Sequence, residues 1–163
     1  MLYFAYGSNM SIVRLRERVP GARRVGTGTL QYHDLRFHKR GADGSAKCDA
    51  FYTGDANHSV YGSLFVIDPA EKPALDAAEG LGVGYGEKPV SVAVGKQQHI
   101  EALTYYALAI DETLNPYSWY VQHVLIGARE TACPPPYLAW IESTTAIDDD
   151  DAARDARERA IHA

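Results

Sequence analysis

Cysteine is scarce in this sequence. The two cysteines, Cys48 and Cys133, lie far apart, and neither belongs to a CxxC pair. Disulfide-rich scaffolds and zinc modules need several cysteines at short, regular spacing. This scarcity argues against both classes, and we expect two reduced thiols. A single disulfide between the two residues stays open at this stage.

Long apolar runs are also absent. The longest, Ser63–Ile67, has the length of a strand, whereas a membrane-spanning helix needs roughly 20 apolar residues. The first residues show neither the basic segment nor the long apolar segment of a signal peptide. We therefore expect a cytoplasmic protein that does not span a membrane.

Positive charge is not in excess. The chain has 16 Lys and Arg against 21 Asp and Glu, which gives a net charge of -5. A protein that binds nucleic acid needs clustered positive charge to replace the counterions on the phosphates. The sequence therefore predicts no nucleic-acid partner.

Motifs for metal and nucleotide binding are missing as well. The six histidines show no HxxxH or HExxH spacing, and the glycines at positions 80, 82, 84 and 86 do not fit GxGxxG. These spacings are what zinc sites and dinucleotide-binding loops require. We expect neither a metal nor a cofactor.

The pattern along the chain predicts many strands and a few short helices. Strands are expected at 3–6, within 23–40, and at 46–52, 59–67, 88–94 and 99–109, and helices at 11–19, 69–79, 116–126 and from 137. The regular alternation of strand and helix that is typical of a doubly wound parallel sheet is missing. We predict an α+β fold, a compact mixed-strand β-barrel with short flanking helices, as one domain over 1–147. Residues 148–163 are expected to form a solvent-facing C-terminal helix or tail, with ion pairs Asp150/Arg154 and Asp155/Arg159.

Two local features are candidates for chemistry. The loop Tyr6-Gly7-Ser8-Asn9 joins a strand to a helix, and consecutive backbone N–H groups at such a place favour a carboxylate or a developing oxyanion. Glu79 is the last residue before a glycine-rich loop. Taken one at a time, these features are better explained as an ordinary capped turn and a solvated glutamate.

Together with their flanks, these features form an ordered series of short motifs. The series is Tyr3-Phe4-Ala5-Tyr6-Gly7-Ser8-Asn9-Met10, then Asp43–Lys47, Val60–Phe65, Leu75–Gly80, Tyr85, Gly127–Glu130, Pro134 and Tyr137. In order and approximate spacing it resembles the γ-glutamylcyclotransferase family, which includes the AIG2-like proteins. The resemblance covers roughly residues 3–142.

The resemblance implies a fold and a set of site residues. It implies a compact barrel with flanking helices, Glu79 as the catalytic acid/base, and no cofactor. It also implies a substrate-binding set made of Tyr6, Gly7, Ser8, Asn9, Tyr85, Tyr106 and Tyr120. The loops at 41–45, 80–86 and 111–117 are expected to shape the side of the site that receives the leaving group.

The implied reaction converts a γ-glutamyl amino acid, peptide or amine to 5-oxoproline and the free amine. The α-amine and the γ-carbonyl belong to one molecule, so a well-oriented substrate closes a five-membered ring without a second reactant. The leaving group stays open among an amino acid, glutathione, an amine and a biosynthetic intermediate. A non-catalytic small-molecule-binding module on the same fold is the alternative function, and a monomer and a homodimer are equally compatible with the sequence.

Overall fold

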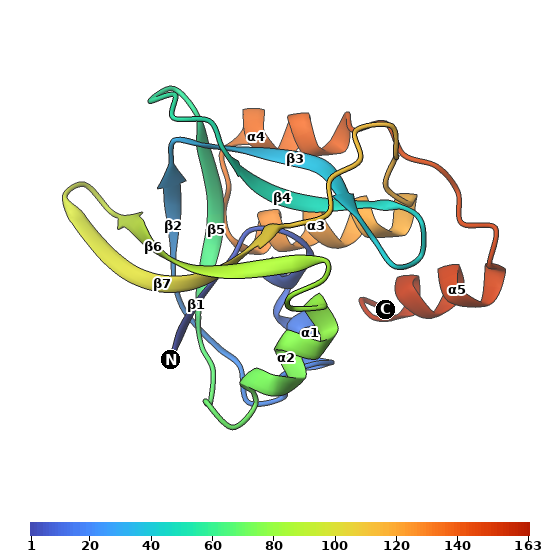
Figure 1. Ribbon diagram of the computed structural model, residues 1–163, viewed down its shortest axis with the longest axis horizontal. Coiled ribbons are helices and arrows are strands. Elements are labelled where there is room, and N and C mark those ends of the chain that lie inside the picture. Colours follow the sequence, from blue (N-terminus) through green and yellow to red (C-terminus); the bar gives the residue numbers. More distant parts are fainter.

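A computed structural model describes all residues, 1–163, and contains a closed five-stranded barrel (Figure 1). Around the barrel the order is β1 (Leu2–Ala5), β5 (Ser59–Val66), β2 (Arg23–Gln31), β6 (Tyr85–Val94) and β7 (Gln98–Ala107). All neighbours are antiparallel except β1 and β7, which close the barrel in parallel where Tyr3 faces Leu103. The predicted α+β fold with a mixed-strand barrel is therefore confirmed.

A hairpin outside the barrel is formed by β3 (His33–Arg40) and β4 (Ala46–Tyr52). The sequence pattern left 23–40 as one β-rich stretch, and the structure divides it at Tyr32, whose φ of 64° turns the chain out of the barrel. The hairpin is tied back to β7, because the Ala107 N–H donates to Asp49 Oδ1 at 2.9 Å. The hairpin thereby forms a wall beside one end of the barrel.

The helix expected after the first strand is shorter than predicted. A 3-10 turn, η1 (Ser8–Met10), comes first and is followed by α1 (Ile12–Arg16). The Ser11 hydroxyl caps α1 by accepting a hydrogen bond from the Arg14 N–H. The buried side chains of Phe4, Met10 and Leu15 join this segment to the barrel core.

Helix α2 (Lys72–Glu79) begins later than the predicted Pro69. Asp68 Oδ1 accepts from the Ala70 N–H and forms a separate turn, and Pro73 occupies the first helical turn instead. The end of the helix is as predicted, because Gly80 adopts φ 69° and ψ 48°, a left-handed conformation that glycine adopts without strain. Glu79 is thus the last helical residue.

Helix α3 (Ser118–Glu130) continues through Gly127, where the sequence pattern placed its end. A Cβ on Gly127 would lie 2.6 Å from both Met10 Cβ and Ser11 N. Glycine is therefore present because η1 packs directly on the helix, not because the helix stops there. The chain then forms α4 (Pro135–Glu142), and none of the helices is long and apolar enough to cross a membrane.

Helix α5 (Ala152–Ala160) docks on α3 through charged side chains, at the red end of the chain in Figure 1. The expected Asp155–Arg159 pair is present, at 2.8 Å, whereas Arg154 pairs with Asp149 and not with Asp150. Glu158 Oε2 lies 2.6 Å from Arg14 Nη1 and 2.9 Å from His123 Nε2. No residue of α5 is buried, so its attachment is mainly electrostatic.

The His123 imidazole is enclosed by the groups that hold α5. Its Nδ1 lies 2.7 Å from His162 Nε2, and Arg14, Glu158 and Trp119 surround the rest of the ring. Burial lowers the pKa of His123 from 6.5 to about 4, although the Glu158 carboxylate acts in the opposite direction. The folded state therefore keeps this histidine neutral at pH values where the unfolded chain binds a proton.

The first prediction concerns the contact between η1 and α3. Gly127→Ala should reduce the free energy of unfolding by about 1–3 kcal/mol, the usual cost of overpacking a close contact. Urea unfolding measures this. Gly26→Ala is the matched control, since the nearest atom to its Cβ is 3.9 Å away. Equal losses in the two variants would show that the η1–α3 contact is not tight.

The second prediction concerns pH. Because the unfolded state binds the extra proton, stability should fall as pH drops from about 6.5 to about 4, by about 1 kcal/mol per pH unit. The free energy of unfolding, measured with urea, should depend less on pH between 6.5 and 4 in His123→Gln than in the wild type. His99→Gln, which changes an exposed histidine, should keep the wild-type dependence. An unchanged slope in His123→Gln would mean that His123 is not the group responsible.

Candidate active site

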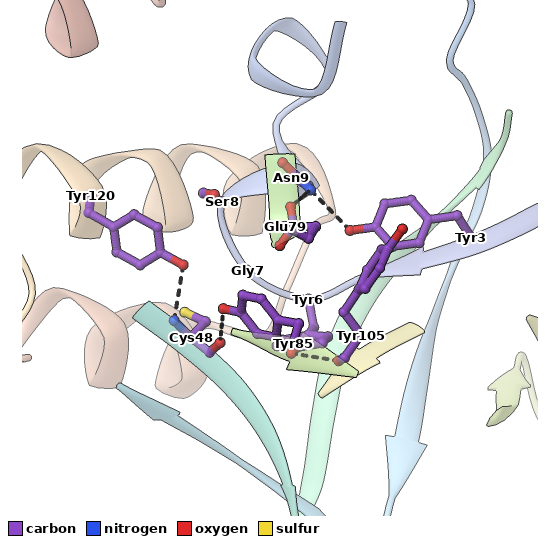
Figure 2. Close-up of a pocket in the computed structure, with 10 residues that line it drawn as sticks. All are labelled: Tyr3, Tyr6, Gly7, Ser8, Asn9, Cys48, Glu79, Tyr85, Tyr105 and Tyr120. Carbon is purple, nitrogen blue, oxygen red and sulfur yellow. Dashed lines mark hydrogen bonds between the residues drawn. The ribbon is translucent and has the colours of Figure 1, made fainter. Parts of the chain in front are cut away.

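A small pocket opens where η1 meets the end of α2 and the start of β6 (Figure 2). Its volume is about 30 Å³. The residues around it are mostly aromatic or small: Tyr3, Tyr6, Gly7, Ser8, Asn9, Cys48, Glu79, Tyr85, Tyr105 and Tyr120. The structure therefore brings the Tyr6–Asn9 loop and Glu79, separated by about half the chain, to one site.

Glu79 presents its two carboxylate oxygens differently. Oε1 accepts hydrogen bonds from Asn9 Nδ2 and Arg18 Nη1, each at 2.9 Å. Oε2 has no hydrogen-bond partner in the protein, and the side chain is 13 % exposed. The carboxylate is thus held by one oxygen, and the other is available to a ligand.

Asn9 is the centre of the hydrogen bonds that hold this carboxylate. Its Nδ2 also donates to the Tyr3 hydroxyl at 3.1 Å, and its Oδ1 accepts from Arg18 at 2.9 Å. Burial raises the pKa of Tyr3 far above its ordinary value, and the nearby Glu79 charge acts in the same direction, so the phenol stays neutral. The sequence pattern included Asn9 in the site but missed its two partners, Tyr3 and Arg18.

The loop after β1 has unpaired backbone donors. Met10 N–H bonds to the Gly7 carbonyl at 3.0 Å, but the N–H groups of Gly7, Ser8 and Asn9 find no acceptor in the protein. A Cβ on Gly7 would lie 3.0 Å from Cys48 Cβ, so the loop lies directly against the buried hairpin. This arrangement offers donors to an anionic or carbonyl oxygen beside Glu79.

Buried tyrosines form the floor of the pocket. Tyr85 Oη donates to the Cys48 carbonyl at 2.6 Å, Tyr120 Oη accepts from the Cys48 N–H at 3.0 Å, and Tyr6 Oη donates to the Tyr105 carbonyl at 2.8 Å. Burial raises the pKa of Tyr6, Tyr85 and Tyr120 well above the ordinary value. These phenols are therefore neutral, fixed parts of the wall.

Tyr106 does not line the pocket, and Tyr105 takes the expected place. Side chains alternate along β7, so the two tyrosines face opposite sides. Tyr105 is 2 % exposed, packs edge-on against Tyr3 and donates to Asp76 Oδ1 at 2.6 Å. Tyr106 lies against Gly86, where a Cβ would be 2.7 Å from the ring. The alternation alone could not tell which of two adjacent tyrosines faces inward.

A larger groove adjoins the pocket and shares Ser8, Glu79, Tyr85 and Tyr120 with it. Its volume is about 550 Å³. Of the loops expected to shape this side, 41–43 and 80–85 contribute residues, whereas 111–117 does not. Arg154 and Glu158 of α5 also line the groove, which the sequence pattern did not indicate. No group of three or more His, Cys, Asp or Glu is placed to hold a metal ion.

The fold and the pocket define a five-stranded barrel with a small pocket that contains a single glutamate. Residues 59–141, half of the chain, match the AIG2-like family, and the protein belongs to that family. It is 28% identical to the γ-glutamylcyclotransferases of Bos taurus, over 149 residues, and of Homo sapiens, over 157 residues. These alignments cover 87% and 92% of this chain and 77% and 80% of the two relatives.

Solved structures share the fold. One described as a γ-glutamyl cyclotransferase superposes with a TM-score of 0.87 at 22% identity, over 99% of this chain and 98% of that one. An uncharacterised human protein gives 0.86 at 24% identity, over the same shares. A yeast γ-glutamyl cyclotransferase described as specific to glutathione gives 0.62 at 10% identity, over 86% of this chain and 93% of the yeast chain. The family resemblance inferred from the motifs is confirmed.

Proposed function

We propose that this protein is a γ-glutamylcyclotransferase that converts a γ-glutamyl amide to 5-oxoproline and the free amine. The observation that carries the proposal is the Glu79 carboxylate, held through Oε1 by Asn9 and Arg18 with Oε2 free at the pocket. The similarity to two γ-glutamylcyclotransferases supports the same reaction.

The reaction needs two proton movements, and one carboxylate serves both. Glu79 Oε2 takes a proton from the α-ammonium of the substrate, and the freed amine attacks the γ-carbonyl carbon. The new C–N bond closes the five-membered lactam. As the old C–N amide bond breaks, Glu79 returns this proton to the departing nitrogen. The ring nitrogen then gives up its second proton through the same carboxylate to the released amine, which departs as an ammonium ion. Atoms and charge balance without water or a cofactor.

The backbone donors of the Tyr6–Asn9 loop have a role in this scheme. The attacked carbonyl oxygen becomes negative, and the unpaired N–H groups of Gly7, Ser8 and Asn9 are available to stabilise it. Loss of one such donor typically costs about 2.7–4 kcal/mol in the barrier. The loop packs against Cys48 and Tyr120, and this packing limits how far the donors can move during the reaction.

The neutral tyrosine wall supports the same chemistry. Tyr6, Tyr85 and Tyr120 are each less than a tenth exposed and have their hydroxyls occupied by backbone groups. They exclude water from the reacting atoms without introducing a competing acid or base. In such surroundings the charge of Glu79 and the loop dipoles act more strongly than in water.

The third prediction is that Glu79→Gln remains folded but forms 5-oxoproline on the order of 10²–10⁴-fold more slowly than the wild type. The glutamine carbonyl oxygen can accept the hydrogen bonds of Asn9 and Arg18, so the side chain keeps its place. It cannot carry a proton. The assay measures kcat on γ-glutamyl-alanine, glutathione and Nε-(γ-glutamyl)lysine.

Glu87→Gln is the matched control, because it makes the same chemical change two residues after Tyr85 and outside the pocket. It should retain wild-type kcat. If Glu79→Gln keeps more than about a tenth of wild-type kcat, Glu79 is not the catalytic acid/base. A wild-type protein that binds these substrates without releasing 5-oxoproline would be the non-catalytic binding module instead.

A further inference from the structure

The groove that leads from the Glu79 pocket is rich in basic side chains. Six of them line it: Arg14, Arg18, Lys39, Arg40, Lys47 and Arg154. Three acidic residues line it as well: Asp43, Glu79 and Glu158. The groove is thus positive within a chain whose net charge is -5.

Five of the six basic groups already have an acidic partner. Within the groove, the pairs are Arg14–Glu158, Arg18–Glu79 and Lys47–Asp43, at 2.6, 2.9 and 2.8 Å. Arg40 and Arg154 pair with acids outside it, Asp111 and Asp149. Lys39 is the only basic residue of the groove without an ion pair, and its ammonium donates no hydrogen bond in the protein.

Lys39 is also buried, which makes its lack of a partner unusual. The residue is 7 % exposed, and its Nζ lies 4.4 Å from the centroid of the Tyr85 ring. Burial lowers the pKa of this ammonium, while the charges of Glu79 and Asp43 raise it. The Nζ atom itself is not fully enclosed and faces the groove, but partial removal of water from an ammonium group without an ion pair still carries a cost. A ligand anion in the groove would remove that cost.

The backbone directs this side chain into the groove. A register shift in the β3–β4 pairing falls between Phe37 and Lys39, and bulges of this kind change the direction of neighbouring side chains. His38 points to Asp49 at 2.8 Å, whereas Lys39 extends to the glycine-rich loop. A Cβ on Gly84 would lie 2.7 Å from Lys39 Nζ, so that glycine leaves the space that the ammonium occupies.

Tyr85 connects Lys39 to the reacting amide. Its ring lines both the Glu79 pocket and the groove, and Lys39 lines only the groove. If the γ-glutamyl group binds beside Glu79 and its leaving group extends into the groove, that leaving group passes Tyr85 and comes close to Lys39. In an α-amino acid leaving group, the carboxylate is only two bonds from the amide nitrogen, within reach of a cation next to the pocket.

We propose that Lys39 is a specificity-determining residue that binds the carboxylate of the leaving amino acid. This inference rests on the proposed function. It selects, among the leaving groups that the sequence left open, those with a carboxylate next to the departing amine. Amines without a carboxylate at that position lose this contact and are poor substrates.

The fourth prediction compares two substrates that differ only in that carboxylate, γ-glutamyl-alanine and γ-glutamyl-alaninamide. The wild type should have the higher kcat/KM on γ-glutamyl-alanine. Lys39→Met keeps the aliphatic stem against Tyr85 and removes the charge. It should raise KM for γ-glutamyl-alanine about 10- to 100-fold, the usual effect of losing a hydrogen bond to a charged group. KM for the alaninamide should change less than about twofold.

Lys88→Met is the matched control, since it removes a lysine charge on β6 outside both the pocket and the groove. It should leave both substrates unaffected. Equal losses on both substrates in Lys39→Met, or a wild type that does not prefer the carboxylate, would overturn the role of Lys39. If Lys39→Met does not fold, Lys39→Gln takes its place in the same assay. The ratio of wild-type kcat/KM on γ-glutamyl-alanine to that on γ-glutamyl-alaninamide tests the role of Lys39 without any variant. Absence of 5-oxoproline from both substrates with the wild type would instead refute the proposed function.

Discussion

The hydrogen bond from Asn9 Nδ2 to Glu79 Oε1 joins two elements that are 70 residues apart in the chain. Asn9 belongs to η1, which rests on α3 at Gly127, and Glu79 ends α2 at the left-handed Gly80. The geometry of the pocket therefore depends on both supports at once. Arg18 reinforces the contact by donating to both side chains. The carboxylate is held by one oxygen, and the other has no partner in the protein.

Charge in the site is distributed in a consistent way. The tyrosines of the pocket are buried and neutral, so Glu79 is the one charged side chain among the residues that line it. In the groove, acids and bases are paired, with Lys39 as the exception. Tyr85 lines both cavities together with Glu79, and the unpaired Lys39 lies over its ring in the groove.

Several elements were predictable because their signals are local. The first strand, the turn at Gly7, the β-rich hairpin and the end of α2 at Gly80 follow from side-chain pattern and glycine conformation. Local signals also produced the errors. Asp68-Pro69 is typical of a helix start, but it forms a separate turn before α2. Gly127 is typical of a helix end, but it lies inside α3 and allows η1 to pack closely on that helix.

The sequence by itself was enough to predict a mixed-strand barrel, a binding loop at Tyr6–Asn9 and Glu79 as a site residue. Strand periodicity, turn residues and short ordered motifs carry these predictions, and all three are properties of neighbouring residues. Only the tertiary structure decided that Tyr105 and not Tyr106 faces the pocket, that Arg18 and Tyr3 complete the hydrogen bonds around Asn9, and that Lys39 lacks a partner. Each of these depends on which distant surfaces meet when the barrel closes, and the burial and pairing of a polar group exist only after that contact forms.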